Sequence, residues 1–291
     1  IDPGAKTVTL VSGTVVGYRQ LVVCPGIQKN WGAVPGLVEA MASPTGVSNY
    51  EIEYAQKASR VLRAMRTGTV VFTQPAGPAT CSAASQKPMY LACDYWRENG
   101  VLDDIRVVLV VPTPTLFGMP MIDAELERKV AGYGIEVHYG RELVGVDVER
   151  KTVALGSTSP QDGPDRGQDG VTSDAVDELS YDVLHAVPPQ SAPDWLGATS
   201  LAEPGNPGGF VEVDALTLRH PRYPDVWALG DAAATINSKS GGALRQQTKV
   251  LAKNLVAARA GDPLPQVYNG YSVCPFTVSR STVVLAEFDD R

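Results

Sequence analysis

The sequence predicts an α/β protein with a doubly wound, nucleotide-type fold in its central part. Apolar strand-like segments and helical segments alternate there in the order strand, helix, strand, helix, strand, which is typical of that fold. The 291 residues are enough for two compact units with a sizeable core. A hydrophobic content of 44% with 20% charged residues is ordinary for such a protein.

The central elements follow from periodicity and from glycine and proline signals. Apolar residues recur at helical spacing over 52–66, and Gly68 is expected to end this helix. The other central elements are expected as a strand at 69–73, a helix at 82–97, a strand at 106–112, a helix at 121–131, a strand at 135–139 and a hairpin at 145–155.

Further elements are expected on both sides of this part. Short strands precede it near residues 8–10, 15–16 and 21–23. After it we expect strands within 180–189, 210–219 and 224–229, a helix at 241–260, and more strands within 264–288. The stretch 156–178 is polar, acidic and rich in glycine and proline, which predicts an exposed insertion.

Composition excludes several classes of function. With 25 basic and 32 acidic residues the net charge is −7, and no basic stripe stands out, so nucleic acid is not expected as a partner. The sequence contains no run of eighteen apolar residues. Its four cysteines form no C-x-x-C pair, which argues against a zinc site or a disulfide scaffold. Cys24 and Cys93 are expected to be structural, because cysteines without such partners are commonly buried.

A Gly-Asp pair follows one of the buried strands. In the stretch VWALGDAAA, Gly230 and Asp231 come at the carboxyl end of the strand. Ligands bind at that edge of open α/β sheets, so the carboxylate can accept a hydrogen bond from a sugar or ribityl hydroxyl. A helix N-cap aspartate gives the same pattern, and the pair alone leaves both interpretations open.

The loop after the strand at 69–73 lacks the glycines of a dinucleotide site. Between residues 72 and 92 only Gly77 remains, so NAD binding is not expected there. Cys81 stands in that loop, directly before the expected helix at 82–97, and Lys87 is nearby in sequence. The partial positive charge of a helix amino end and a neighbouring lysine both favour a thiolate.

These stretches resemble a known family. The segments YRQLVVCPG (18–26), YDVLHAVPP (181–189) and Gly230-Asp231 resemble the crossover strands and the flavin-contacting pair of the pyridine nucleotide-disulfide oxidoreductase superfamily. Within it, PATCSAASQKPMYL (78–91) and YNGYSVCPFT (268–277) are similar to the two cysteine segments of sulfide:quinone oxidoreductases. SNYEIE, TLFGM, LHAVPP, LRHPRYPDVWALGD, NSKSGGA and LAEFD also match in the right order. The subtype indicated is the one shared with mitochondria.

The resemblance implies a two-dinucleotide-binding-domain flavoprotein fold with FAD as cofactor, and it implies the roles of several residues. Cys81 and Cys274 would be the redox pair: hydrosulfide attacks the oxidised pair, one sulfur becomes a persulfide and the other a thiolate. Two electrons then pass to the flavin and on to a membrane quinone, while a small thiol or sulfite accepts the sulfane sulfur. The residues implied at the flavin are Gly26, Gly230, Asp231 and Lys239.

For three residues, Lys239, His185 and His220, the sequence leaves two interpretations open. Lys239 matches a family lysine near the flavin and would stabilise negative charge on the reduced ring; the alternative interpretation is a surface lysine. His185 and His220 match family histidines and can relay protons, since histidine titrates near neutrality, or they can be buried structural residues.

The family's domain order gives the expected boundaries. Residues 1–45 would be the end of the first FAD-domain segment, 46–155 the second domain, 156–180 the insertion, 181–262 the return segment, and 263–291 the start of a membrane-docking region. The phosphate-binding G-x-G-x-x-G of the FAD site does not occur in these residues. We therefore expect the chain by itself to bind FAD weakly or not at all, to be inactive and soluble, and to expose Val273, Phe276 and Val283. The intact protein would be a peripheral membrane protein.

Three functions other than sulfide oxidation with a quinone acceptor are considered. The flavin subunit of a sulfide dehydrogenase would pass electrons to a cytochrome instead of a quinone. A non-catalytic flavoprotein-like interaction domain is disfavoured by the presence of Cys81, Cys274, Asp231 and Lys239. An NADH-dependent disulfide reductase is disfavoured by the missing second glycine motif.

Overall fold

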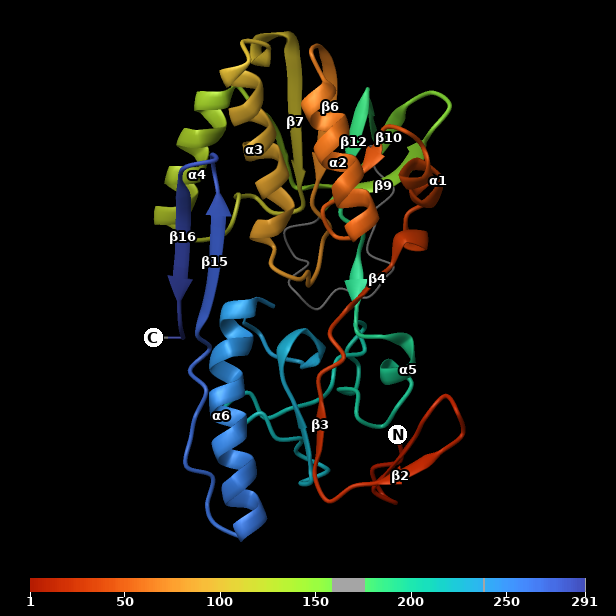
Figure 1. Cartoon of the computed structure of the whole chain (residues 1–291), viewed down its shortest axis with the longest axis vertical. Helices are drawn as coiled ribbons and strands as arrows, with labels where there is room; N and C mark the ends of the chain where they lie inside the picture. Colours follow the sequence, from red (N-terminus) through yellow and green to blue (C-terminus); the bar gives the residue numbers. More distant parts are fainter. Residues whose placement is uncertain (159–175, 238, 291) are drawn as a thin grey trace. The chain divides into compact units, whose positions relative to one another are not determined.

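The computed structural model describes residues 1–158, 176–237 and 239–290 and divides into two compact units (Figure 1). The first unit contains residues 1–28, 190–274 and 287–291, and the second contains residues 29–189 and 275–286. The second unit is thus inserted twice into the sequence of the first.

A five-stranded parallel sheet is the centre of the second unit. Its strands, in spatial order, are β5 (Gly46–Val47), β12 (Val183–His185), β6 (Gly68–Thr73), β7 (Ile105–Val111) and β8 (Glu136–Tyr139). The middle strands are rich in valine and buried, as expected for parallel strands covered on both faces. The helices of this unit are α1 (Leu37–Ala42), α2 (Ile52–Ala64), α3 (Ala83–Glu98) and α4 (Pro120–Tyr133), with 3-10 turns at Trp31–Ala33 and Leu102–Asp104.

An antiparallel sheet and a hairpin complete the second unit. The sheet has the order β11 (Asp177–Ser180), β10 (Thr152–Ser157) and β9 (Arg141–Asp147), and it shares a hydrophobic core with the parallel sheet. The hairpin is formed by β15 (Ser272–Thr277) and β16 (Val283–Phe288), of which residues 275–286 belong to this unit.

The first unit has less regular structure. It contains the hairpin β1 (Thr7–Thr9) and β2 (Val15–Gly17), and the parallel pair β3 (Leu21–Val23) and β14 (Val226–Ala228). Gln28 of the short β4 (Gln28–Lys29) also belongs to it, as does β13 (Gln190–Ser191). Its helices are α5 (Asp194–Gly197), a 3-10 turn at Gly230–Ala232 and the long α6 (Gly241–Ala260). Trp227 and Leu218 pack with α6 in one core, and Phe210 and Val226 lie in another.

The expected order of elements from 52 to 139 is confirmed, but the units divide the chain at other places than expected. Strand β12 lies between β5 and β6, so residues 183–185 join the sheet of the second unit and not the return segment. Residues 29–45 also belong to the second unit. Local pattern identifies a strand but not the sheet that it joins, because partner choice is a non-local property.

Four smaller expectations are corrected. The insertion is shorter than expected, because Asp177–Ser180 form β11 against β10; residues 159–175 lie outside the described part. Gly68 does not end α2, which stops at Ala64; it opens β6 with a φ of 105°, and a Cβ there would contact the Asp182 carboxylate. In the expected strand at 210–219, only isolated bridges at Val211 and Arg219 form. Phe276 is fully buried because it packs edge-on against Phe117.

Candidate functional site

Cys81 lies in the loop between β6 and α3, in the second unit. Its φ of 45° is in the left-handed region, which is uncommon for a residue other than glycine and marks a conformation held by its surroundings. The side chain is partly exposed, and Nζ of Lys87 lies 4.0 Å from its Sγ. Helix α3 begins two residues later, and the side chain of Ser82 makes no capping hydrogen bond. A cation and a helix amino end therefore lie beside the Cys81 thiol.

The segment 48–50 holds this loop in place. The Tyr50 hydroxyl lies 2.9 Å from the carbonyl oxygen of Thr80 and 3.3 Å from that of Cys81. Asn49 acts on the next turn of α3: its Nδ2 donates to the carbonyl of Ala84 at 2.8 Å. Pro88, inside the helix, has no N–H for that carbonyl, so the Asn49 amide replaces the missing helical bond.

His185 is part of this support. Its ring is fully buried at the end of β12, and Nε2 lies 3.1 Å from Oδ1 of Asn49. Because Asn49 uses its amide nitrogen for Ala84, its oxygen accepts and His185 Nε2 donates. Nδ1 is buried and has no partner among the described residues. Burial lowers the pKa of His185 to about 4, so the ring stays neutral near pH 7. This arrangement favours the structural interpretation over a proton relay.

The Gly-Asp pair lies in the first unit, at the carboxyl ends of two parallel strands. Strand β14 runs into Gly230, and the neighbouring β3 runs into Cys24 and Gly26. Gly26 has a φ of 84° and Gly230 one of 69°, which side chains rarely tolerate. The Gly230 amide donates to Oε1 of Gln247 at 2.7 Å. Asp231 is partly exposed and lies in a 3-10 turn at the expected edge of the strands.

Lys239 is buried, and the alternative of a surface lysine is wrong. Its ammonium donates to the carbonyls of Asp231 at 2.8 Å and Ala233 at 2.9 Å, and it lies 3.9 Å from the ring centroid of Phe210. Burial lowers its pKa to about 8, although Asp231 opposes the shift. Lys239 thus joins the Gly-Asp turn to the start of α6 and brings a buried positive charge to it.

His220 is also buried in the first unit. Its Nδ1 accepts hydrogen bonds from the backbone amides of Arg222 at 3.1 Å and Tyr223 at 3.3 Å, which closes the turn before β14. Nε2 has no partner among the described residues. Burial lowers the pKa of this histidine. As for His185, the contacts favour a structural role.

Cys274 is fully buried in β15. The strand segment before it packs against the amino end of α6: Ser272 Oγ lies 3.0 Å from Ser240 Oγ, and Ser240 caps the helix by accepting from the Ala243 amide. Gly242 is required at this contact, because a Cβ there would overlap Cγ1 of Val273. Cys274 belongs to the first unit and Cys81 to the second, so their pairing stays a prediction.

The other cysteines behave differently from each other. Cys93 is buried inside α3, as expected, and burial raises the pKa of its thiol. Cys24 is exposed, contrary to expectation, because it lies in the turn after β3 rather than inside the strand. No group of three or more histidine, cysteine or carboxylate side chains within the described ranges could hold a metal ion. Among these same residues, no helix is long and apolar enough to cross a bilayer.

Sequence reasoning missed the residues that support the site. Asn49 and Tyr50 stand in a matched motif, but the motif alone gives them no role. Pro88 is the signal that could have led to Asn49, because a proline inside a helix leaves a carbonyl that needs another donor. Phe210 contacts Lys239 and Gln247 contacts Gly230 from other parts of the chain, and no local signal points to them.

Comparisons with known proteins find similar chains by sequence and by fold. No model of a protein family matches the chain. The mitochondrial sulfide:quinone oxidoreductase of Mus musculus is 29% identical over 289 residues, which are 99% of this chain and 61% of that protein. The mitochondrial sulfide:quinone oxidoreductase of Schizosaccharomyces pombe is 31% identical over 293 residues, which are 99% of this chain and 60% of that protein. The chain thus spans about 60% of the length of these relatives.

Solved structures show the same fold. A chain in the mitochondrial ATP synthase of Tetrahymena thermophila has a TM-score of 0.80 at 23% identity, covering 100% of this chain and 68% of that one. The sulfide:quinone oxidoreductase of Aquifex aeolicus has a TM-score of 0.77 at 18% identity, covering 99% of this chain and 69% of that one. By sequence the chain is similar to mitochondrial sulfide:quinone oxidoreductases, and its fold is similar to that of the Aquifex aeolicus enzyme.

Proposed function

We propose that the full-length protein containing this chain oxidises sulfide and passes the electrons through FAD to a quinone. Cys81 and Cys274 form the redox pair. Hydrosulfide attacks one sulfur of their disulfide, the S–S bond breaks, one cysteine keeps the added sulfur as a persulfide, and the other leaves as a thiolate. A small thiol or sulfite then takes the sulfane sulfur. The quinone implies a peripheral contact with a membrane.

The observation that carries this proposal is the surroundings of Cys81. The Lys87 ammonium at 4.0 Å and the amino end of α3 both stabilise a thiolate, which is the reactive form in disulfide exchange. The left-handed backbone at Cys81, supported by Tyr50, sets its side chain at the start of the helix. Cys93 lies buried in the same helix, and burial raises the pKa of its thiol despite the nearby Arg97.

The residues at the Gly-Asp turn fit the flavin end of FAD. Asp231 can accept from a ribityl hydroxyl, Gly26 and Gly230 leave room for close approach, and Lys239 supplies a positive charge at a turn where a reduced ring carries negative charge. When bound, the flavin supplies a two-electron acceptor that can be reoxidised by quinone. The buried Lys239 ammonium costs desolvation, which a negative group nearby would offset.

Sulfide-dependent reduction of decylubiquinone by the full-length protein tests this function. We expect Cys81→Ser and Cys274→Ser each to lower the rate by about a thousandfold or more, because the covalent route is lost. Cys93→Ser is the matched control and should keep most of the activity. Near-normal turnover by Cys81→Ser would contradict the proposal. Reduction of a c-type cytochrome without reduction of quinone would instead support the sulfide dehydrogenase alternative.

A further inference from the structure

The strand that carries Cys274 continues into a turn that is fixed to two helices of the second unit. After Cys274, β15 runs through residues 275–277 to the turn 278–282, and β16 returns from it. The turn is closed by hydrogen bonds from the amide of Val278 to the carbonyl of Thr282 at 3.1 Å and between the Ser279 and Thr282 hydroxyls at 2.7 Å. The turn is therefore a defined structure that other residues can hold.

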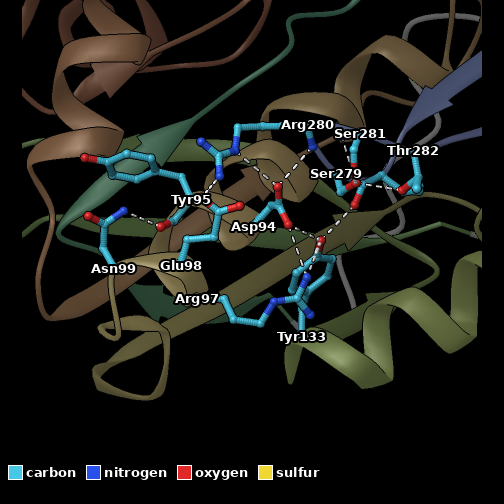
Figure 2. Close-up of polar contacts among 11 residues, drawn as sticks. Asp94, Tyr95, Arg97, Glu98, Asn99, Tyr133, Ser279, Arg280, Ser281 and Thr282 are labelled. Atoms are coloured by element: carbon cyan, nitrogen blue, oxygen red, sulfur yellow. Dashed lines mark hydrogen bonds and ion pairs between the residues drawn. The ribbon is translucent and has the colours of Figure 1, made fainter.

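Asp94, on α3, is the main contact of this turn (Figure 2). Its side chain is only 10% exposed, and Oδ2 accepts the backbone amide of Arg280 at 3.0 Å and lies 3.4 Å from Nε of the same residue. Oδ1 accepts from Arg97 at 3.1 Å. Burial by itself raises the pKa of Asp94, but these hydrogen bonds outweigh it and hold the pKa below its usual range. The carboxylate is thus charged and bound to the turn.

Tyr133, at the end of α4, holds the same turn from a second side. Its hydroxyl donates to the carbonyl of Val278 at 2.9 Å and accepts from Nη2 of Arg97 at 3.2 Å (Figure 2). The Arg97 guanidinium also lies over the Tyr133 ring, 4.4 Å from its centroid. Arg97 therefore links Asp94 to Tyr133, and the two helices act on the turn together.

Nearer to Cys274, an aromatic contact fixes the strand itself. Phe276 is fully buried, and its ring meets Phe117 edge-on with centroids 5.1 Å apart. The loop of Phe117 is held by Asp123, which accepts the Phe117 amide at 2.7 Å, and by Gln86, which donates to the Leu116 carbonyl at 2.8 Å. The segment after Cys274 is thus held at a side chain two residues away and at the turn.

We propose that Asp94 and Tyr133 are positioning residues that hold the Cys274 strand for reaction, by fixing the turn into which that strand runs. The same helix that carries Asp94 begins two residues after Cys81, so one rigid element would fix the cysteine near its amino end and the strand of the second cysteine near its carboxyl end. This inference rests on the proposed redox role of Cys274. Asp94 and Tyr133 act through the strand and need not touch sulfide or flavin.

The chain contains its own controls for a test by cysteine labelling. Cys24 is exposed, Cys274 is buried, and Cys93 is buried next to Asp94 on the same helix. The full-length flavoprotein is reduced, treated with N-ethylmaleimide for increasing times, and digested, and each cysteine is quantified by mass spectrometry. The variants are Asp94→Asn and the milder Tyr133→Phe. Glu98→Gln is the matched control, since Glu98 also contacts Arg280 from α3 but is half-exposed.

We expect labelling of Cys274 to become about tenfold faster in Asp94→Asn, and less so in Tyr133→Phe, because a lost buried hydrogen bond increases local opening. It should not change in Glu98→Gln, since exposed ion pairs contribute little. Cys93 should stay protected and Cys24 reactive in every variant. Sulfide-dependent flavin reduction should slow by about tenfold in Asp94→Asn and by less in Tyr133→Phe, while flavin content and reduction by dithionite stay the same.

Several outcomes would overturn the inference. Unchanged protection of Cys274 in both variants would show that the turn does not hold the strand. Equal acceleration at Cys93 would show that helix α3 has opened as a whole. Faster labelling of Cys274 without slower flavin reduction would show that the strand's position does not matter for the reaction. Failure of the proposed function itself would appear separately, as sulfide turnover that survives Cys81→Ser in the otherwise native protein.

Discussion

Helices α3 and α6 begin at the two candidate sites, and they begin in different ways. Helix α6 has a side-chain cap from Ser240, which also contacts Ser272, and Gly242 lets the strand before Cys274 pack against its first turn. Helix α3 has no such cap from Ser82 and follows the left-handed Cys81. At α6 the Ala243 amide donates to the Ser240 side chain, whereas at α3 the equivalent Ser85 amide donates to the backbone carbonyl of Ser82.

The lysines near the two helix starts also differ in burial and in contacts. Lys239 is buried and uses its ammonium for two backbone carbonyls, so its charge is part of the local structure. Lys87 lies next to the Cys81 thiol and is partly exposed. The start of α6 is therefore held by buried side-chain contacts, whereas the start of α3 places a partly exposed lysine beside the Cys81 thiol.

The largest expected effect concerns the buried charge at α6. Because the pKa of Lys239 is lowered from 10.5 to about 8, the unfolded chain binds more protons between these two pH values, and stability rises with pH there. We expect the wild type to gain up to about 3 kcal/mol over this range relative to Lys239→Met. Urea unfolding at pH 7.5, 9 and 10 measures this, with the exposed Lys249→Met as control. If the free energies of unfolding of wild type and Lys239→Met changed with pH in parallel, the buried charge of Lys239 would not distinguish the start of α6.

The caps themselves give an intermediate effect. Ser240→Ala should lower the free energy of unfolding by about 1 kcal/mol, because it removes a helix cap and leaves the Ser272 hydroxyl without this partner. Ser82→Ala, at the equivalent position of α3, should change it by only a few tenths of a kcal/mol. The urea unfolding midpoints of the two variants measure this difference in stability. Equal losses would mean that the two helix starts do not differ.

The smallest effect is expected at Cys81. Lys87→Met should slow alkylation of Cys81 at pH 7 by about threefold to fivefold, because one charge at 4.0 Å stabilises the thiolate by about 1 kcal/mol in water. The difference should shrink in 1 M salt, where the Debye length is about 3 Å. Iodoacetamide labelling of the reduced protein measures the rate, with Lys249→Met as control. A salt-independent effect would point to altered packing instead.

The sequence predicted well what depends on local pattern. The alternation of strands and helices from 52 to 139, the position of Cys81 just before α3, and Gly230-Asp231 after β14 are each read from neighbouring residues, and the structure has them there. The match to the family motifs predicted which of these positions take part in the reaction. Local periodicity and capping rules are sufficient for such features because their causes lie within a few residues.

What could not be predicted depends on residues far apart in the chain. Phe276 was expected to be exposed, but it is covered by Phe117, 159 residues before it. The partners of Lys239 and His185 decide that both side chains are buried, and no spacing rule brings Asn49 to His185 across 136 residues. The placement of β12 in the sheet of the second unit also depends on residues far apart in the chain. Tertiary contacts settle these cases, and single-sequence patterns do not contain them.

The pairing of β3 with β14 also has a consequence for the order of folding. Gln20 lies 205 residues from Asp225 and 207 from Trp227 along the chain, yet its side chain bonds both. Closing so long a loop is slow and costs chain entropy, but that cost falls once the sheet encoded between residues 29 and 189 has formed. During synthesis this sheet is complete before residue 226 leaves the ribosome. Until then β3, within residues 1–28, has no partner strand. Chaperones are most able to bind this segment in that interval.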